Sequence, residues 1–561
     1  MWHLLFFWLL AAGLSLPCQA QLQFPGRPHM EAVDLKDAEI RYVLPPVDPL
    51  EMDAAIQDNR MKDKKSLRFA MQRSIDIEPG AQGGWATLSA YRIWRVHIIS
   101  PGAFSVGLLF RDYELADGVR LFVYDPQMQY VKGAFTSGNN KPSGVMHTGH
   151  IPGEEVVVEM QVPHSLSVFG TLRIESVSHG FLKAGRARTP ADIRFGRSEA
   201  CEIDINCGEG SGWQQTKRSV VRIQTPTQYC TGVLVNNTAF DGTPYIITAE
   251  HCINRQDVAE ASVFVFNYES PSCFDGDGSV EMSISGCDLL ATGDSVDFSL
   301  VRLSTVPPDT FNIYYAGWDR NINQLSYSST IHHPMGDVKK ISYDFEVPSI
   351  PVGLDELPDS DLRDYIYYSY WWVRQWDIGS TEGGSSGAPL FNSLRRVIGT
   401  LSGGKAKCGM AIGYDSVANR IIYSKVPNQN DYFTRVSVAW NYYEDPGASI
   451  RPWLDPAGSG VISLDGYEPA GREDHRLTGS GRFRVYPNPA LETLVIEPAG
   501  PVTGEISFRL IDLSGRICLA GTRQKAAGPI YLSPVQIGPG LYLLVIEEGG
   551  KLESHKIMIG R

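Results

Sequence analysis

Short runs that alternate between apolar and polar residues fill much of the chain after Trp85. A period of two puts one face of a β-strand on a core and the other face in solvent, so each run predicts a half-buried strand. Asp-Gly, Pro-Gly and Ser-Gly pairs part the runs, as the turns of an antiparallel β-sandwich require. The runs of this first β region are 91–98, 106–110, 119–124, 156–160 and 171–174.

Two further regions follow the first. The end of the chain alternates again and predicts a small all-β module over 483–561, after a Gly- and charge-rich linker at 469–482. A basic stretch from Lys183 to Arg197 has the composition of a solvated, cleavable linker. Between the two linkers lies a central unit, residues 198–468, which holds most of the cysteines. Three folded units suit a chain of 561 residues.

The chain begins with an apolar stretch that is too short to span a bilayer, and that ends in Cys18-Gln19-Ala20. A short apolar core followed by a small residue predicts a secretory signal peptide over residues 1–20. A lipid-anchoring signal at Cys18 is the alternative, but Pro17 stands where that signal needs a small residue. We therefore expect soluble export and no transmembrane segment.

Composition narrows the class of protein further. Acidic residues outnumber basic ones by 63 to 50, for a net charge of −13. Binding to phosphate backbones needs clustered Lys and Arg, so nucleic acid is excluded as the expected partner. The 55 Gly, 35 Pro and 25 Tyr suit a turn-rich, mainly β protein better than a helical bundle.

The nine cysteines point to an oxidising compartment. Removing a signal peptide that ends at Ala20 takes Cys18 with it and leaves eight cysteines, for which pairing is the default outside the cytosol. A zinc site would call for close Cys-x-x-Cys pairs, and the sequence has none. We expect disulfides, with no metal and no cofactor.

Three short segments of the central unit carry the residue types of nucleophilic catalysis. His251 follows a β-like run within the segment TAEHC, Asp297 leads into a strand within DFSLV, and Ser386 lies in the Gly-rich turn GGSSGAP. Alone, each has a plain structural explanation: a histidine beside a cysteine, a turn aspartate and a loop. Their conjunction, in the order His, Asp, Ser and with Cys230 and Cys252 able to brace the histidine loop, predicts a catalytic triad.

The chemistry explains why these three types belong together. A serine hydroxyl is a poor nucleophile until a base within hydrogen-bond reach takes its proton. Histidine has the pKa for that step and for protonating the leaving amine later. A buried carboxylate fixes the imidazole tautomer, and glycines around the serine let backbone N–H groups converge on the oxyanion.

Longer motifs extend the similarity over the whole central unit. They run from CEID at 201–204 to WLDP at 453–456, and include CTGVLVNNT at 230–238, AGWDR at 316–320, IHHP at 331–334 and TEGGSSG at 381–387. The unit resembles the trypsin-like (chymotrypsin-fold) serine peptidases, and within them the bacterial lysyl endopeptidases. The resemblance implies two six-stranded β-barrels with the active site between them, and no cofactor.

Residue by residue, the resemblance makes His251 the general base, Asp297 its partner and Ser386 the nucleophile. It assigns the oxyanion hole to the backbone N–H groups of Gly384 and Ser386. The family's S1 carboxylate lies in a segment that has the form DYFTRV here, so Asp431 is the candidate that would pair with a substrate Lys or Arg. A surface Asn-Asp turn is the alternative for Asp431.

The family also has a histidine in the Gly-Gly segment after the nucleophile. This chain instead has Ser402, Gly403 and Gly404 there, as in ordinary trypsins, whose serine and glycine backbone pairs with an extended substrate. These three residues are therefore the candidates for substrate binding along the backbone. An insertion after Cys408, over about 409–429, is expected at the rim of the pocket.

The family's disulfides transfer to six of the cysteines and leave Cys287 without a counterpart, which we expect to be a buried free thiol. The pairs implied are Cys201–Cys408, Cys207–Cys273 and Cys230–Cys252.

The C-terminal module begins with RVYPNP at 484–489 and resembles the sorting domains of the type IX secretion system. The resemblance implies a short Ig-like sandwich that is recognised at the outer membrane and usually cleaved off. A structural β domain that binds an extracellular partner is the alternative.

Residues 21–197 would then be a propeptide that contains the first β region. Aligning Cys201 with the family's first cysteine puts the mature start near 196–198, where Arg194 and Arg197 lie. Since the nearest lysine is Lys183, either the S1 pocket accepts Arg or another Arg-cleaving protease performs the processing.

Together these features predict a secreted serine endopeptidase, made as a zymogen, that cleaves proteins or peptides after Lys or also Arg. We expect a monomer that is exported through the periplasm, engages the type IX secretion machinery and reaches the medium or the outer cell surface. The alternatives are an inactive protease-like binding module, against which the intact triad motifs argue, and an adhesin displayed at the cell surface.

Overall fold

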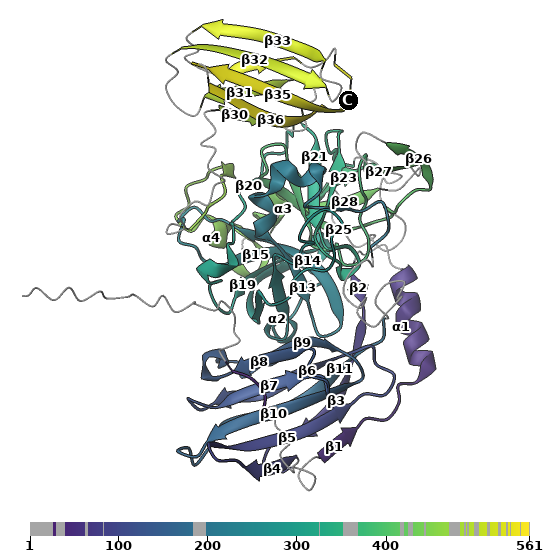
Figure 1. The fold of residues 1–561 in the computed structure, drawn as a ribbon, viewed down its shortest axis with the longest axis vertical. Coiled ribbons are helices and arrows are strands. Elements are labelled where there is room, and N and C mark those ends of the chain that lie inside the picture. The colour runs from purple at the N-terminus through teal and green to yellow at the C-terminus, as the bar shows by residue number, and fades with distance from the viewer. Residues whose placement is uncertain are drawn as a thin grey trace, which may run out of the picture.

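A computed structural model gives the fold of the protein, and it is mainly β, as the sequence predicts (Figure 1). The first 25 residues, including the predicted signal peptide, lie outside the described part of the chain. The residues described are 26–29, 40–61, 66–81, 83–182, 198–324, 326–351, 368–415, 420–424, 430–442, 445–469, 483–486, 490, 493–498, 504–512, 516–524, 529–533, 537–538, 540–549 and 551–559.

The N-terminal domain, residues 40–182, is a sandwich of two sheets around a buried apolar core that includes Trp94 and Phe110. Its six-stranded sheet contains β1 (Ile40–Val43), β4 (Gly84–Thr87), β5 (Tyr91–Ile99), β7 (Arg120–Tyr124), β8 (Val131–Phe135) and β10 (Glu155–Pro163). Its four-stranded sheet contains β3 (Ala70–Ile77), β6 (Ser105–Leu115), β9 (Met146–Pro152) and β11 (Gly170–Gly180). The sandwich predicted from the alternating runs is therefore present.

The central domain, residues 198–469, consists of two larger sheets that make the two β halves of a chymotrypsin-like fold. The first sheet has the order β17-β16-β13-β14-β15-β19-β18. Its strands are β13 (Val220–Gln224), β14 (Gln228–Val235), β15 (Tyr245–Thr248), β16 (Val263–Phe266), β17 (Ser283–Ser285), β18 (Cys287–Gly293) and β19 (Phe298–Leu303). The short helix α2 (Gln256–Glu260) follows β15.

The second sheet of the central domain has nine strands in the described part of the chain. They are β12 (Ile203–Asp204), β20 (Trp318–Asp319), β21 (Ser328–His332), β22 (Lys340–Asp344), β23 (Tyr370–Val373), β24 (Pro389–Asn392), β25 (Val397–Gly404), β28 (Asp431–Arg435) and β29 (Ser463–Leu464). The hairpin of β26 (Ala411–Asp415) and β27 (Arg420–Tyr423) is separate, and helices α3 (Val436–Ala439) and α4 (Arg451–Leu454) close the domain.

The C-terminal domain, residues 483–559, is a second sandwich around its own small core. One sheet holds β30 (Phe483–Tyr486), β31 (Leu494–Pro498) and β34 (Ile530–Leu532). The other holds β32 (Glu505–Asp512), β33 (Ile517–Gln524), β35 (Gly540–Glu548) and β36 (Lys551–Ile559). An Ig-like sandwich of this size is what the resemblance to sorting domains implies.

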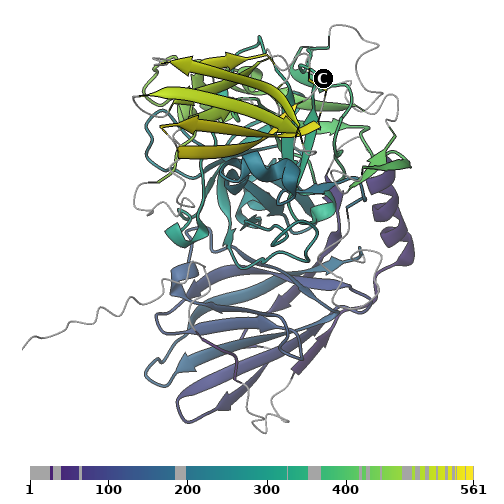
Figure 2. The ribbon, with the colours of Figure 1, turned by 45° about the horizontal axis from the view of Figure 1, so that its top comes forward.

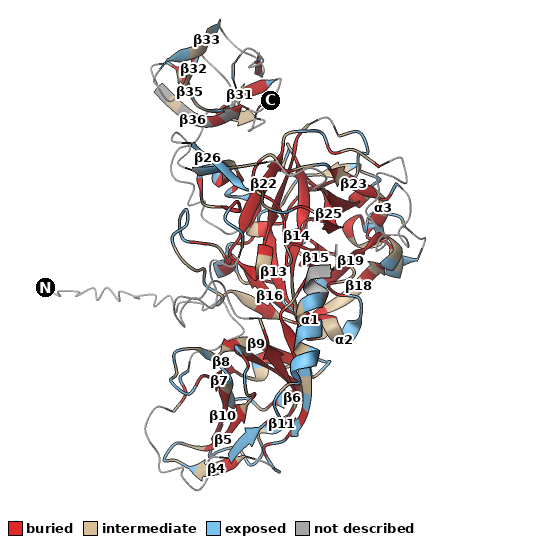
Figure 3. Ribbon diagram, turned by 90° about the vertical axis from the view of Figure 1, so that its right-hand side faces the viewer, coloured by how far each residue is buried: buried red, intermediate tan, exposed pale blue. Residues whose placement is uncertain are grey.

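The N-terminal domain reaches across to the central domain by one strand. After helix α1 (Pro49–Met61), strand β2 (Leu67–Arg68) leaves its own domain and pairs antiparallel with β14. Strand β9 faces β16 and β17, so the two domains lie side by side (Figure 2). Figure 3 shows buried residues throughout the sheets of both domains, whereas α1 is mostly exposed.

Three disulfides cross-link the central domain, and their pairing is the one that the resemblance implies. They are Cys201–Cys408, Cys207–Cys273 and Cys230–Cys252. Cys287 is a buried free thiol, and burial raises its pKa well above the usual value, so it is protonated and inert. Among the described residues, no helix is long and apolar enough to cross a membrane.

Candidate active site

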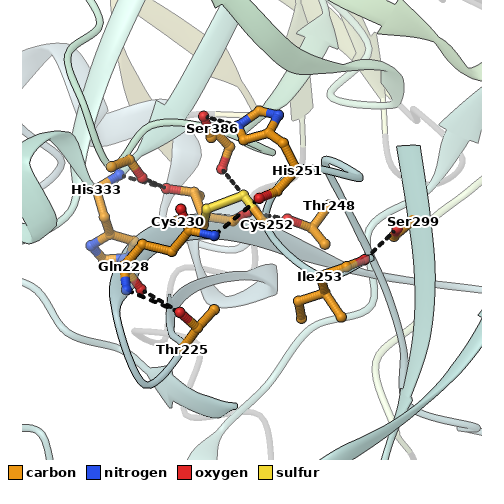
Figure 4. Close-up of a disulfide and its surroundings, with 12 residues drawn as sticks. Thr225, Gln228, Cys230, Thr248, His251, Cys252, Ile253, Ser299, His333 and Ser386 are labelled. Carbon is orange, nitrogen blue, oxygen red and sulfur yellow. Dashed lines mark hydrogen bonds between the residues drawn. A yellow bond between two sulfur atoms is a disulfide. The ribbon is translucent and has the colours of Figure 1, made fainter. Parts of the chain in front are cut away.

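The structure brings together the three residues that separate motifs supply. His251 lies just after β15, and Figure 4 shows its ring facing the hydroxyl of Ser386. The distance from His251 Nε2 to Ser386 Oγ is 2.6 Å, and His251 Nδ1 lies 2.9 and 3.0 Å from the two carboxylate oxygens of Asp297. With the Nδ1 proton held by Asp297, Nε2 is an acceptor for the serine proton.

Asp297 sits in an unusual backbone conformation that aims its carboxylate at the histidine loop. It ends the short 3-10 turn Asp294–Val296 with φ 53° and ψ 55°, in the left-handed region. Asp enters this region more readily than most residues, and strained conformations of this kind cluster at functional sites. Its carboxylate is fully buried and also accepts the backbone N–H of His251 at 3.1 Å.

The sequence has two neighbouring serines in the Gly-rich turn, and the structure distinguishes between them. The Ser386 hydroxyl contacts His251, whereas the Ser385 hydroxyl lies 2.8 Å from Nδ1 of His332. Ser385 Oγ also accepts the backbone N–H of Glu382 at 3.2 Å, which closes the turn. Only Ser386 therefore has the geometry of an activated nucleophile.

The backbone before Ser386 is held in one orientation by a hydrogen bond and by close packing. The carbonyl of Gly383 accepts the N–H of Met335 at 2.5 Å, which fixes one side of the Gly383–Gly384 peptide. Because N–H and C=O point in opposite directions in a trans peptide, the N–H of Gly384 faces the other side. Gly384 has φ +96°, and an added Cβ would meet the backbone of His333 and Gly336, so glycine is required there.

Several bonds hold the histidine loop and the serine turn in register (Figure 4). The Cys230–Cys252 disulfide joins β14 to the residue after His251. The N–H of Thr231 donates to the carbonyl of Ser386 at 2.8 Å, and the Gln228 side chain donates to the carbonyl of His251 at 3.0 Å. The disulfide predicted to brace the histidine therefore joins the histidine loop to β14, and the bond from Thr231 joins β14 to the serine turn.

Asp431 begins β28 and is a second fully buried carboxylate, not a surface turn. Its Oδ2 accepts the indole N–H of Trp376 and the hydroxyl of Thr381, each at 2.6 Å. Thr381 lies five residues before Ser386, so this bond ties the carboxylate to the turn that carries the serine. A buried carboxylate so positioned can receive a cationic side chain.

The three candidates for backbone recognition lie at the end of β25, directly beside Asp431. Gly404 pairs with Asp431 and Gly403 with Tyr432 in the register of β25 and β28. An added Cβ at Gly404 would overlap the Asn430 carbonyl and the carboxylate of Asp431, so this edge requires a glycine. The hydroxyl of Ser402 lies 2.7 Å from that of Thr434.

Sequence reasoning missed Trp376 and Thr381 as the partners of Asp431. Thr381 begins the segment TEGGSSG, which places it near Ser386 but does not indicate a bond to Asp431. No motif around Trp376 indicates that it contacts Asp431. The insertion after Cys408 forms the hairpin of β26 and β27, and its residues Ile421 and Ile422 line a pocket with Trp376. That pocket is not lined by Asp431 or Ser386, so the position of the insertion at the rim of the substrate pocket stays a prediction.

The two neighbouring histidines of IHHP are both buried, and neither is arranged as a metal ligand. Burial holds the pKa of His333 well below its usual value, and its Nδ1 lies 2.9 Å from the carbonyl of Asp337. In the part of the chain that the structure describes, no three His, Cys, Asp or Glu side chains cluster closely enough to hold a metal.

Residues 195–417 match the family model of the lysyl endopeptidase C-terminal domain. This part of the chain is thus similar to the lysyl endopeptidases. A curated relative is a lysyl endopeptidase of Pseudomonas aeruginosa, 25% identical over 305 residues. That match takes in 51% of this chain and 60% of the relative, so a large part of the relative's length has no counterpart in the match.

Residues 484–560 match the secretion system C-terminal sorting domain, which indicates export to the cell surface or secretion. Two solved structures also show likeness. A Glu endopeptidase has a TM-score of 0.24 at 12% identity, covering 39% of this chain and 85% of its own. Kallikrein-related peptidase 10 has a TM-score of 0.26 at 13% identity, covering 42% and 96%.

Proposed function

We propose that this chain is a secreted serine endopeptidase that hydrolyses peptide bonds after Lys, with Ser386 as nucleophile, His251 as general base and Asp297 as its partner. The observation that carries the proposal is the distance of 2.6 Å between His251 Nε2 and Ser386 Oγ, with Asp297 on the far side of the ring. The match of residues 195–417 to the lysyl endopeptidase C-terminal domain supports it independently.

In the proposed mechanism each step falls on a named atom. His251 Nε2 takes the Ser386 proton as Oγ attacks the substrate carbonyl, and the same nitrogen then protonates the leaving amine. Asp297 stabilises the imidazolium that forms between these two transfers. The N–H groups of Gly384 and Ser386 bind the developing oxyanion, where each donor contributes about 3 kcal/mol to the transition state.

Asp431 supplies the selectivity of the proposed S1 pocket, because a cation must compensate for the burial of its charge. Its Oδ2 is already shared by Trp376 and Thr381. A guanidinium binds a carboxylate best with two parallel hydrogen bonds, which need both oxygens, whereas an ammonium is a point charge that needs only one. This arrangement favours Lys over Arg.

Residues 21–197 would act as a propeptide, and the first described residues after it fit a start of the mature enzyme near Ser198. The N–H of Ser198 lies 3.0 Å from Oδ2 of the buried Asp337, and the N–H of Glu199 lies 2.9 Å from Glu382. Cleavage after Arg197 would turn the Ser198 amide into an ammonium beside the Asp337 carboxylate, which strengthens this contact.

The test uses purified, secreted protein after removal of the N-terminal domain, with Lys, Arg and Leu p-nitroanilide peptides. We expect hydrolysis of the Lys substrate first, and Ser386→Ala should lower kcat on the order of 10⁶-fold. The matched control is Ser385→Ala, which should keep most of the activity because its hydroxyl contacts His332 and not His251. Absence of hydrolysis by folded, processed protein would reject the enzyme; unchanged activity of Ser386→Ala would reject the nucleophile.

A further inference from the structure

The N-terminal domain places a strand of its own at the active site. Leu67 and Arg68 of β2 pair antiparallel with Tyr229 and Gln228 at the start of β14. The next residues along β14 reach the catalytic centre: Cys230 is bonded to Cys252, and the N–H of Thr231 donates to the carbonyl of Ser386. Strand β2 therefore lies on the edge that leads to the nucleophile.

The direction of this strand is decisive. Because β2 runs antiparallel to β14, following the chain backward from Arg68 to Ser66 leads toward Ser386. An added Cβ on Gly383 would lie 3.5 Å from the Cβ of Leu67 and 3.5 Å from the carbonyl oxygen of Ser66. Ser66 and Leu67 thus lie against the oxyanion turn, with the chain running away from the serine in its N-to-C direction.

This chain direction is the one expected for the part of a substrate that follows the scissile bond and leaves as the amine product. In a bound substrate, residues after the scissile bond run away from the nucleophile, while residues before it approach on the other side. The acyl side of this site is built by Asp431 and the end of β25, and Ser66–Phe69 lies on the opposite side, against β14. In the sequence, Ser66 follows Lys65, which lies outside the described residues.

The strand is firmly anchored on both domains. The Leu67 side chain is buried, and the Phe69 ring stacks on Tyr229 with 4.0 Å between the ring centroids. The N–H groups of Phe69 and Ala70 both donate to the carbonyl of Thr227, at 2.9 and 3.1 Å. Ala70 then begins β3, so the strand is a direct continuation of the N-terminal sandwich.

A second contact holds the two domains in this position. The Lys141 ammonium of the N-terminal domain donates to the carbonyls of Ser285 and Glu260, at 3.2 and 3.4 Å. Burial lowers the pKa of Lys141 to about 8, which reflects how completely the docked domain encloses it. Strand β2 is therefore held against β14 by the contacts of the whole N-terminal domain.

We infer that Ser66–Phe69 occupies the leaving-group side of the substrate cleft and inhibits the precursor by excluding the residues that follow the scissile bond of a substrate. One edge of β14 can pair with only one strand there, so the segment and a substrate compete for the same backbone groups. The triad stays assembled beneath it, with His251 and Ser386 in contact. This inference rests on the proposed function.

The test compares two Leu→Glu variants of the full-length chain. Leu67→Glu puts a charge at a buried position of β2, where the strand pairs with β14. Leu50→Glu makes the same change on α1, where the side chain is 77% exposed. Intact precursor, verified by mass spectrometry, is assayed with a fluorogenic peptide that has four residues on each side of a central Lys. We expect Leu67→Glu to raise kcat/KM at least tenfold over the parent and Leu50→Glu to match the parent.

A milder variant guards against misfolding. Phe69→Ala removes the ring that stacks on Tyr229 and should raise the same kcat/KM about threefold, with unchanged circular dichroism. If both variants stay folded and neither exceeds the parent, the inference is wrong, provided that the parent becomes active once the N-terminal domain is removed. If the processed parent is inactive too, the proposed function fails instead, so the two failures are distinguishable.

Discussion

Asp297 and Asp431 of the central domain are both fully buried, but their carboxylates have different partners. Asp297 faces the imidazole of His251 at 2.9 and 3.0 Å. Asp431 faces two neutral donors, the indole of Trp376 and the hydroxyl of Thr381, at 2.6 Å each. In the proposed mechanism, the first carboxylate stabilises the imidazolium that forms during the reaction, and the second receives the cation that the substrate brings.

The backbone conformations of Asp297 and Asp431 differ as well. Asp297 occupies a left-handed conformation at the end of a 3-10 turn, whereas Asp431 lies in a regular strand, β28, paired with β23 and β25. In the proposed mechanism, the strained residue Asp297 serves a step that every substrate shares, so its orientation must be held tightly. The strand residue only has to present its charge at a fixed depth. Catalysis and selectivity are thus separated, and each can be broken alone.

The largest effect is expected from Asp297→Asn. An amide cannot stabilise the imidazolium and favours the wrong tautomer of His251, so kcat should fall on the order of 10⁴-fold for every substrate. Steady-state kinetics with a Lys p-nitroanilide and a Lys ester should show the same loss. Asp294→Asn, in the same turn but with an exposed side chain, is the control and should leave kcat unchanged. A selective loss on one substrate would contradict the assigned role.

A smaller and selective loss is expected from Asp431→Asn. Removing one partner of a buried ion pair costs about 3–4 kcal/mol, so kcat/KM for Lys substrates should fall about 10²–10³-fold. The rate at which a small neutral sulfonyl fluoride modifies Ser386 should stay nearly constant, because that reagent does not use the carboxylate. Equal losses in both measurements would mean that Asp431 does not recognise the substrate.

The triad could be predicted from sequence because each member lies in a short contiguous motif. TAEHC, DFSLV and GGSSGAP need no knowledge of the fold, and their order indicates a family of folds. The partners of Asp431 could not be predicted in this way. Trp376 is 55 residues from Asp431 along the chain and Thr381 is 50 residues away, and only the packing of the second sheet brings them together.

The segment that covers the leaving-group side was missed for a different reason. A strand of two residues, Leu67–Arg68, is too short to show alternation. Helix α1 before it packs only Met52, Ala55 and Ile56 into a small cluster, and its other described positions are mostly exposed. Its apolar stripe is too short to stand out in the sequence. Both elements are stabilised by tertiary contacts with the central domain and the sandwich, which a local pattern does not contain.

The smallest effect is expected from Trp376→Phe, which tests how the buried carboxylate of Asp431 recognises the substrate. Trp376→Phe keeps the ring but removes the indole N–H that Oδ2 of Asp431 accepts, so this oxygen becomes available to a second donor of the substrate. The indole also holds the carboxylate in place for the single contact of an ammonium. Losing that positioning should cost about 1.5 kcal/mol of Lys binding, so KM for Lys substrates should rise about tenfold with kcat little changed.

The preference for Lys over Arg should also narrow, because a guanidinium can then use both oxygens of Asp431. The matched control is Trp453→Phe, which removes an indole N–H that donates to the carbonyl of Pro446. That variant should leave the Lys-to-Arg ratio of kcat/KM unchanged. If Trp376→Phe raises KM equally for both substrates, Trp376 only supports the pocket wall; if the ratio falls, the indole sets how the buried charge of Asp431 is shared between protein and substrate.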